Sequence, residues 1–468
     1  MTRARALIAA AVLTATAAPA VAWETTTHVG LAEQAALAAN LDAWLRALGH
    51  RGGLFEPLTV PPADAPELFA ALAAHTAIDG YVPDLRGQQT ALAWLLAGAA
   101  LADATPAWAA NHFFDPTTGA GWRAPARSWL GRLDERLRRQ GGGPSAGRPA
   151  PDWIVADDNP LGMAGWVDQY DKAVRAATPG ERARHLAGAL VAAGAMLHVL
   201  GDLGGPSRVR GDAAAHFDDL GRGERGSRFE RLVAIAYGRL GVPAATDVPS
   251  RSDWRAYFTS DGAGTRAGLA EWTGRQFFSE HTLPRPAEVG RASGATLAAV
   301  LARAQVRPLP QVTNQLSMVV ATQRQGATLR DLFGVCLARY RKVRGTLSWW
   351  LDDDCLLEQA RVILPVVAGY QAGLLRWLGR GQLAMTVADG KLALSARGAA
   401  LGAGTLTVLT EDGRGVRTPV ATVELSGAAD GAALGAWPVP AGVAAAAVFR
   451  GVDGAGQPVV AVGHLMLP

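Results

Sequence analysis

The stretch ERARHLAGALVAAGAMLHVLGDL, residues 181–203, predicts a buried central helix. Ala, Leu and Val fill most of it, and Gly-Gly-Pro at 204–206 is a stop signal. His198 and Asp202 are four residues apart, so their side chains lie on one face of this helix. A buried carboxylate without a partner is unfavourable, and a metal ion bound by both side chains would supply one. The alternative from these residues alone is a core histidine bonded to a carboxylate at the helix end.

The first 22 residues have the composition of an export signal. A basic start, an apolar centre and a small-residue cleavage site ending at Ala22 follow one another. Cleavage there would make Trp23 the first residue, and its amine and carbonyl oxygen could chelate a metal near His28. The alternative is an arbitrary terminus followed by a surface histidine. We expect a secreted or periplasmic protein in which no later segment is long and apolar enough to span a membrane.

The rest of the chain divides into two regions with different sequence patterns. Residues 29–378 are mainly periodic Ala/Leu/Arg-rich segments separated by Gly and Pro, which predicts helices. After Gly381 the pattern changes to short alternating runs with Gly- and Asp-containing turns, which predicts a small antiparallel β-sandwich. We therefore predict a mainly α protein with a helical domain at 23–380 and a β-sandwich domain at 381–468. The predicted strands are 383–387, 391–395, 405–409, 421–425, 445–450 and 459–467.

Composition limits the class of protein. A chain of 468 residues with 49% hydrophobic content can bury a large core and is long enough for two domains. The formal charge of +4 is small for this length, and no basic cluster indicates a nucleic-acid surface. Cys336 and Cys355 could form one disulfide across a helical hairpin, and the sequence leaves this open.

Four further side chains could bind a metal. His112 stands beside an Asp-Pro turn signal, and Asp103 follows the apolar segment 91–102. His216 and Glu230 come after the central helix. The ordinary interpretations are a helix-end residue for Asp103, a solvated histidine for His216 and the start of an exposed helix for Glu230. A set of imidazoles and carboxylates suits zinc in a site with open positions.

The order and spacing of these residues resemble the zinc-dependent phospholipase C and single-strand-specific nuclease superfamily. The resemblance covers about residues 23–378, and it includes a bacterial secreted subgroup through Phe277–Glu280 and the segment 363–375. The strand-rich tail lies outside it. The matching motifs are Trp23 with His28, Gly98-x-x-x-x-Asp103, His112-Phe-x-Asp-Pro116, and His198-x-x-x-Asp202 followed by Pro206.

This resemblance implies two zinc sites that share Asp202. The first zinc would be held by Asp103, His112, His198 and Asp202. The second would be held by Trp23, His28 and Asp202. In the first site, Asp103 would be both a ligand and the general base that orients a metal-bound hydroxide toward phosphorus.

A third zinc of the family needs a histidine six residues after Asp202, and here that residue is Arg208. Arginine carries a fixed positive charge and has no lone pair to donate to a metal. His216 and Glu230 remain as candidate ligands, but two protein ligands are fewer than catalytic zinc usually has. We therefore expect two zinc ions rather than three. Arg208 would then pair with Glu230 or contact a substrate phosphate.

Three functions are compatible with the residues. The first is an exported zinc-dependent phosphodiesterase of phospholipase C type, acting on a phospholipid or another phosphodiester, with a membrane surface as a partner. The second is a single-strand nuclease of the same fold, which the weak net charge disfavours. The third is a degenerate, non-catalytic zinc protein acting through its C-terminal domain, for which Arg208 is the main support.

Overall fold

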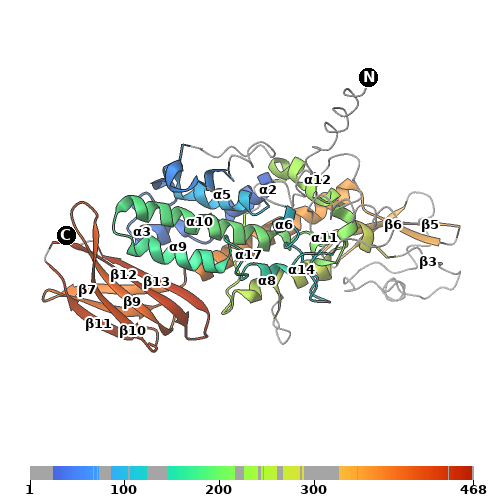
Figure 1. The fold of residues 1–468 in the computed structure, drawn as a ribbon. Coiled ribbons are helices and arrows are strands. Elements are labelled where there is room, and N and C mark those ends of the chain that lie inside the picture. The colour runs from blue at the N-terminus through green and yellow to red at the C-terminus, as the bar shows by residue number, and fades with distance from the viewer. Residues whose placement is uncertain are drawn as a thin grey trace, which may run out of the picture.

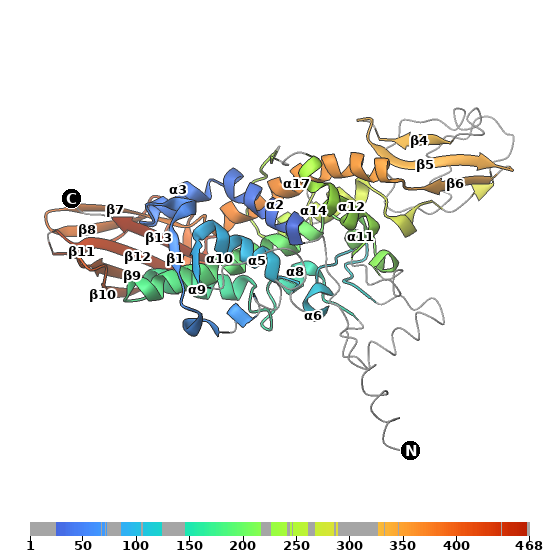
Figure 2. The ribbon, with the colours of Figure 1, turned by 90° about the horizontal axis from the view of Figure 1, so that it is seen from above.

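The chain forms a helical bundle with a β-sheet at each end, as the computed structural model in Figures 1 and 2 shows. The predicted export signal and Trp23 lie outside the residues that the structure describes. The described residues are 25–66, 68–70, 72, 86–103, 106–123, 146–216, 226–240, 244–245, 247–260, 267–284, 287–288, 326–331, 333–344, 346–440 and 442–465.

The central helix α10 (Pro179–Asp202) confirms the prediction for residues 181–203 within two residues at its start and one at its end. Thr178 and Glu181 form a capping box: the Glu181 amide donates to Thr178 Oγ1 at 3.2 Å, and the Thr178 amide donates to Glu181 Oε2 at 3.1 Å. Almost every side chain from Leu186 to Asp202 is buried. Around it pack α5 (Ala91–Leu101), α9 (Met163–Arg175) and α17 (Asp353–Leu378), as Figure 2 shows.

Two glycines allow α5 and α10 to approach closely. A Cβ at Gly98 would lie 2.0 Å from the carbonyl oxygen of Val191, and a Cβ at Gly194 would lie 1.9 Å from that of Leu95. Neither contact is sterically allowed, so only glycine fits. The close approach brings the C-terminal ends of the two helices together, where the candidate ligands lie.

α10 is also long and apolar enough, by length and composition, to cross a membrane. The expectation that no segment after the export signal has such a composition is therefore wrong. Of its most apolar 18-residue window, 78% is buried inside the fold. Contact with the neighbouring helices accounts for its apolar character.

The remaining helices surround this centre. α2 (Thr25–Ala38) packs against both α17 and α5, so it confirms a helix near the predicted start. Among the described residues, the other helices are α3 (Leu41–Ala47), α6 (Pro106–Ala109), α8 (Ala150–Trp153), α11 (Pro206–Val209), α12 (Arg228–Ala236), α13 (Arg255–Phe258) and α14 (Leu269–Gln276). Short 3₁₀ turns are η1 (Gly53–Phe55), η2 (Pro62–Asp64), η3 (Ala213–His216), η4 (Tyr237–Arg239) and η5 (Glu280–Thr282).

Part of the region predicted to be helical forms sheets instead. β1 (Pro57–Thr59) pairs with β2 (Gln88–Thr90). A four-stranded antiparallel sheet has the order β3-β6-β5-β4, and the Thr and Trp residues of β6 favour extended backbone. Its strands are β3 (Ala287–Glu288), β4 (Ala327–Arg330), β5 (Cys336–Val343) and β6 (Thr346–Trp350).

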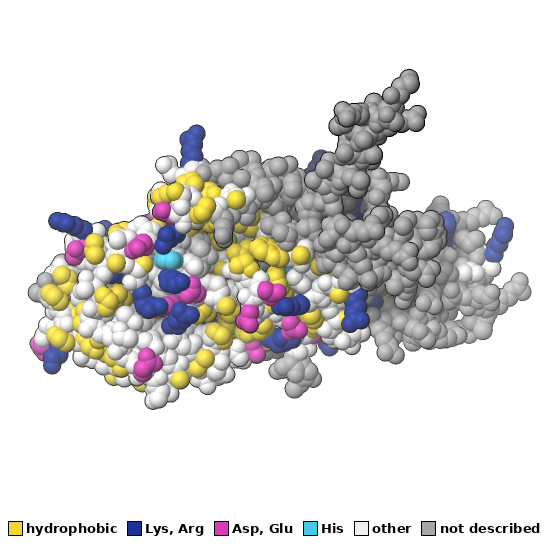
Figure 3. Space-filling model, in the orientation of Figure 1, with side chains coloured by type: hydrophobic (Ala, Val, Ile, Leu, Met, Phe, Trp, Pro, Cys, Tyr) yellow, Lys and Arg dark blue, Asp and Glu magenta, His cyan; other side chains and the backbone are white. Residues whose placement is uncertain are grey.

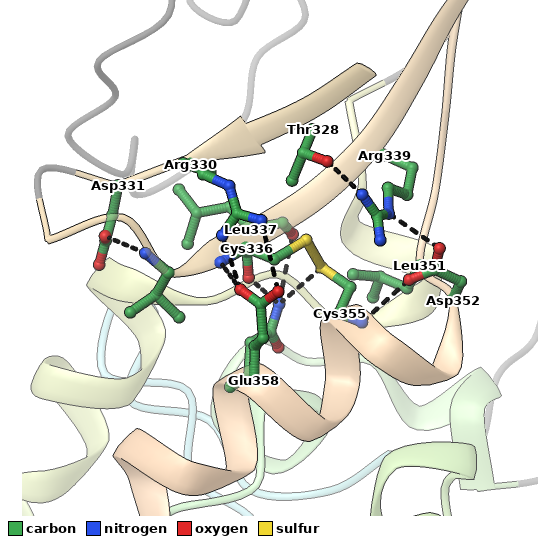
Figure 4. Close-up of a disulfide and its surroundings, with 12 residues drawn as sticks. Thr328, Arg330, Asp331, Cys336, Leu337, Arg339, Leu351, Asp352, Cys355 and Glu358 are labelled. Atoms are coloured by element: carbon green, nitrogen blue, oxygen red, sulfur yellow. Dashed lines mark hydrogen bonds and ion pairs between the residues drawn. A yellow bond between two sulfur atoms is a disulfide. The ribbon is translucent and has the colours of Figure 1, made fainter. Parts of the chain in front are cut away.

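The two cysteines form a disulfide, but not across a helical hairpin. Cys336 begins β5 and Cys355 lies in the first turn of α17, as Figure 4 shows. The Glu358 carboxylate of α17 accepts the Cys336 amide at 3.0 Å and pairs with Arg330 of β4 at 2.7 Å. The disulfide and these bonds attach the four-stranded sheet to the end of the long helix.

The C-terminal region corrects the predicted fold class. Its strands form one seven-stranded sheet in the order β10-β9-β12-β13-β7-β8-β11, in which β13 and β7 run parallel, rather than a small antiparallel sandwich. With 44% helix, 26% strand and a nearly closed mixed sheet, the protein is not mainly α. Its strands are β7 (Gln382–Ala388), β8 (Lys391–Arg397), β9 (Leu401–Glu411), β10 (Arg417–Leu425), β11 (Ala433–Pro438), β12 (Ala444–Asp453) and β13 (Pro458–Leu465).

Both faces of the central strands are buried. Val448 and Val460 point into the large core that contains the helices, whereas Ala447, Phe449 and Ala461 belong to a second core enclosed by the curved sheet. Because side chains alternate along a strand, each central strand contributes to both cores. The boundary predicted near residue 380 coincides with the change from α17 to β7, and separate folding of 381–468 stays a prediction.

Candidate metal centre

Four buried side chains from three parts of the chain meet at the end of the bundle. Asp103 follows α5, His112 lies in the turn after α6, and His198 and Asp202 come from the last turn of α10. One ligand atom from each lies within 4.8 Å of the others. This buried cluster could hold a metal ion. The four side chains are at most 2% exposed.

The distances show how tightly the four side chains converge. His112 Nδ1 lies 2.9 Å from Asp103 Oδ1 and 2.8 Å from Asp202 Oδ2. His198 Nε2 lies 3.2 Å from Asp103 Oδ2 and 3.3 Å from Asp202 Oδ2. Ligand atoms around one tetrahedral ion at about 2 Å are spaced about 3.3 Å apart, so small shifts of these side chains would admit a metal.

A backbone carbonyl group holds the imidazole ring of His198 in the orientation that metal-binding histidines usually have. Its Nδ1–H donates to the carbonyl oxygen of Ala99 in α5 at 2.6 Å. That bond turns the buried Nε2 toward the carboxylates of Asp103 and Asp202, to which it makes ion-pair contacts without a well-aligned hydrogen bond. A ring fixed through one nitrogen and presenting the other to a cluster of carboxylates is the arrangement that supports a metal ligand.

The charges of the cluster balance one another. Burial lowers the pKa of His198, but Asp103 and Asp202 outweigh it and raise that pKa to about 10. Burial opposes ionisation of the two carboxyl groups, yet His198 and His112 hold the pKa of Asp103 well below its usual range. Arg208 and His198 do the same for Asp202. A bound divalent cation would take over the role of the proton on His198.

His28 lies against the same cluster. Its ring stacks on that of His198 with 3.4 Å between centroids, and its Nε2 lies 3.3 Å from Asp202 Oδ1. Burial, reinforced by His198, lowers the pKa of His28 to about 4, so the imidazole is neutral, as a ligand must be. His28 and Asp202 are therefore in contact, and a second, shared metal at these residues stays a prediction. The role of Trp23 stays a prediction.

Arg208 lies beside the cluster and is buried. Its Nε donates to Glu230 Oε1 at 3.0 Å, its Nη2 lies 3.9 Å from Asp202 Oδ1, and its guanidinium stacks 4.3 Å from the Phe113 ring. Glu230 is 1% exposed, so the interpretation of an exposed helix start is wrong for this residue. His216 Nε2 lies 2.9 Å from Ser207 Oγ. Arg208 and His216 thus both contact Glu230, and none of the three belongs to the four-residue cluster.

Three residues near the centre were not predicted from the sequence: Gln371, Gly201 and Ser207. Gln371 of α17 is fully buried and donates through Nε2 to the carbonyl oxygen of Leu197 at 2.7 Å. A Cβ at Gly201 would lie 2.6 Å from that Nε2 and 3.5 Å from His28 Nδ1, so Gly201 lets α2 and α17 approach the metal-binding turn. The presence of a glutamine inside the apolar segment 363–375 could have indicated a role for Gln371. No sequence pattern around Ser207, next to Arg208, indicated a role for that serine.

A partly open hollow of about 230 Å³ lies next to the cluster. We call it the apolar hollow. Asn159 is its one polar side chain, and its amide donates to the Trp153 carbonyl at 3.0 Å and accepts from the Leu161 amide at 3.1 Å. Its lining includes Ala102, Trp108, Trp153, Leu161, Ala195 and Val199.

Comparison with protein-family models and with curated proteins finds no match to this chain.

Proposed function

We propose that this protein is an exported zinc-dependent phosphodiester hydrolase of phospholipase C type. The observation that carries the proposal is the buried His₂Asp₂ cluster, in which the ring of His198 is oriented with Nε2 facing the two carboxylates. Nitrogen and carboxylate donors in this number suit zinc. The disulfide supports an oxidising compartment, in agreement with the expected export.

Each ligand would have a distinct role. Asp103, His112, His198 and Asp202 would hold one zinc ion, and His28 with Asp202 would contribute to a second. When bound, zinc supplies a Lewis acid for phosphate oxygens and activates water near neutral pH. Asp103 stays ionised because the pKa of its carboxyl group is low, which a ligand or proton acceptor requires. The Ala99 carbonyl accepts the Nδ1 proton of His198 and so directs Nε2 toward the centre.

The apolar hollow favours a lipid over a nucleic acid. Ala195 and Val199 in its wall lie on the same stripe of α10 as Asp202, and Val199 is within one helical turn of that ligand. Trp108 and Trp153 meet at 50° rather than in parallel, so they form no slot for a flat base. The Asn159 amide bonds to backbone. Such a wall accepts hydrocarbon next to a phosphodiester.

The charge distribution agrees with this choice. On the face seen in Figure 3, Lys and Arg side chains of the described residues alternate with Asp and Glu rather than forming one basic track. The pairing of Arg208 with Glu230 supports the expectation of a fixed cation in place of a third zinc.

Metal analysis combined with two substrates tests this function. The purified protein should contain about two zinc ions and hydrolyse short-chain phosphatidylcholine at least tenfold faster than single-stranded DNA, and a chelator should abolish both metal and hydrolysis. Preferred cleavage of DNA would identify the nuclease instead. Bound zinc without hydrolysis of either substrate would favour the non-catalytic alternative.

A further inference from the structure

Next to Arg208, three side chains form a row that belongs to no metal cluster among the described residues. Ser207 Oγ lies 2.9 Å from His216 Nε2, and His216 Nδ1 lies 3.5 Å from Glu230 Oε2. A hydroxyl, an imidazole and a carboxylate in this order are the parts of a nucleophile, its base and the group that orients the base. The second distance is long for a hydrogen bond, as such contacts often are before substrate binds.

The surroundings fix the tautomer of His216. The Ser227 amide donates to Glu230 Oε2 at 2.7 Å, and Arg208 holds Oε1, so the carboxylate cannot turn away. An ionised carboxylate facing Nδ1 favours a proton on that nitrogen, which leaves the Nε2 lone pair to accept the Ser207 hydroxyl.

Ser207 also lines a second hollow, which we call the serine hollow and which holds about 260 Å³ of empty space, part of it open to solvent. Six of its eleven lining residues are apolar, and the polar ones are Ser207, Ser227, Ser279, Glu280 and Gln359. Leu351 and Leu356 flank the Cys336–Cys355 disulfide, which holds this wall in place, and Figure 4 shows Leu351 beside it. A hydroxyl with a base behind it and an apolar hollow in front suits a small apolar acyl group.

We propose that Ser207, His216 and Glu230 form a second hydrolytic site that cleaves small apolar carboxylic esters. Ser207 Oγ would bond to the ester carbonyl carbon while its proton moves to His216 Nε2. The ester C–O bond would then break, and the leaving alcohol would take that proton. Water would release the acid by the same two steps, which restores the serine. This site does not depend on the proposed phosphodiesterase function.

Covalent labelling tests the proposal without reference to zinc. A fluorophosphonate probe should modify the purified protein, and peptide mass spectrometry should locate the label on Ser207. Ser207→Ala should abolish the label, and His216→Asn should slow labelling at least about 100-fold, because the base is lost. Ser395→Ala and His185→Asn, a serine and a half-buried histidine elsewhere, are the matched controls and should label like the wild type.

A second variant guards against misfolding. Ser207→Cys should react with iodoacetamide faster than a free cysteine, because His216 would remove the thiol proton. Circular dichroism checks the fold of each variant. A label on another residue, no label at all, or equal labelling after His216→Asn would overturn the proposal, and so would slow alkylation of Ser207→Cys. Labelled Ser207 together with hydrolysis of p-nitrophenyl butyrate would support it.

Discussion

At the scale of single residues, Asp202 is the hub of the centre. Its two oxygens lie within 3.3 Å of nitrogens of His28, His112 and His198, and Arg208 lies just beyond. The same carboxylate therefore connects the four-residue cluster, the position of His28 and the buried arginine.

We expect Asp202→Asn to remove the bound metal while preserving the shape of the side chain. The amide has no negative charge to balance a cation, so affinity falls sharply. Wild-type protein should lose about 2–4 kcal/mol of unfolding free energy on chelation, as ligand linkage requires, and the variant should lose none. Elemental analysis and thermal unfolding with and without chelator measure both effects.

Asp171→Asn is the matched control for that experiment. Asp171 is equally buried but pairs with Arg175 and Arg450, away from the centre. Its metal content should be that of the wild type. If Asp202→Asn also keeps its metal, the cluster is only a hydrogen-bonded core, which was the alternative for His198 and Asp202.

Arg208 permits a second residue-scale prediction. Arg208→Met would leave Glu230 buried without its cation, and breaking one side of a buried ion pair costs about 3–5 kcal/mol. Adding Glu230→Gln should restore part of that loss, because the uncompensated charge is gone. Chemical denaturation of the two single variants and the double variant gives the coupling energy. Strictly additive losses would show that the two side chains do not stabilise each other.

At the scale of elements, the centre depends on the contact between α5 and α10. Asp103 follows one helix and His198 belongs to the other, and the bond from His198 to Ala99 joins them. The glycine contacts determine how close the two helices lie.

Gly194→Ala should therefore destabilise the protein and weaken metal binding. Alanine favours helix by about 1 kcal/mol over glycine, but its Cβ would lie 1.9 Å from the Leu95 carbonyl oxygen, and overpacking costs about 1–3 kcal/mol. Gly188→Ala in the same helix meets only the flexible end of Gln169, so it should be neutral or stabilising. Thermal unfolding and zinc titration compare the two, and equal behaviour would contradict this account of the packing.

At the scale of the whole molecule, the seven-stranded sheet and the helical bundle share a core and a polar junction. Arg417 Nη1 donates to the Val174 carbonyl of α9 at 2.7 Å, and Arg450 Nη1 lies 3.2 Å from Asp171 Oδ2. A Cβ at Gly49 would lie 2.8 Å from the His464 ring of β13, so the turn after α3 packs directly on the sheet. His50 lies next to this contact.

His50 should make that junction sensitive to acid. Burial lowers the pKa of His50 to about 4; Glu56 opposes the shift, and Arg417, His464 and Arg182 add to it. The unfolded chain takes up the proton near 6.5 and the folded chain only near 4, so stability falls as pH drops through this window. We expect His50 to contribute about 1–2 kcal/mol of that loss.

The difference between wild type and His50→Gln isolates this residue from the other buried histidines. Near pH 7.5, the unfolding free energies of the two proteins should change with pH at nearly the same rate. Between pH 6.5 and 4, the unfolding free energy of the wild type should fall more than that of His50→Gln. Parallel curves across that window would show that His50 does not titrate differently in the folded state.

The sequence by itself determined the local features of this protein. Apolar composition and the Gly-Gly-Pro stop signal identified α10, and alternation identified six of the seven C-terminal strands. β11, with its Ala-Leu-Gly-Ala-Trp-Pro sequence, was missed because it alternates weakly. Residue chemistry and order also selected Asp103, His112, His198 and Asp202, which meet in space. These features follow from side-chain spacing along the backbone, which a sequence displays directly.

Only the tertiary structure decided which strands, helices and side chains contact one another. Periodicity marks a strand but not its neighbour, so the parallel β13–β7 pair and the single curved sheet were not foreseeable. The sequence around Cys336 was predicted to be helical but forms a strand, because short apolar runs are compatible with either structure and tertiary packing determines which one forms. Ser207 meets His216 only because α11 and η3 fold back on each other. Such contacts depend on the burial of distant surfaces, and no local pattern of residues encodes them.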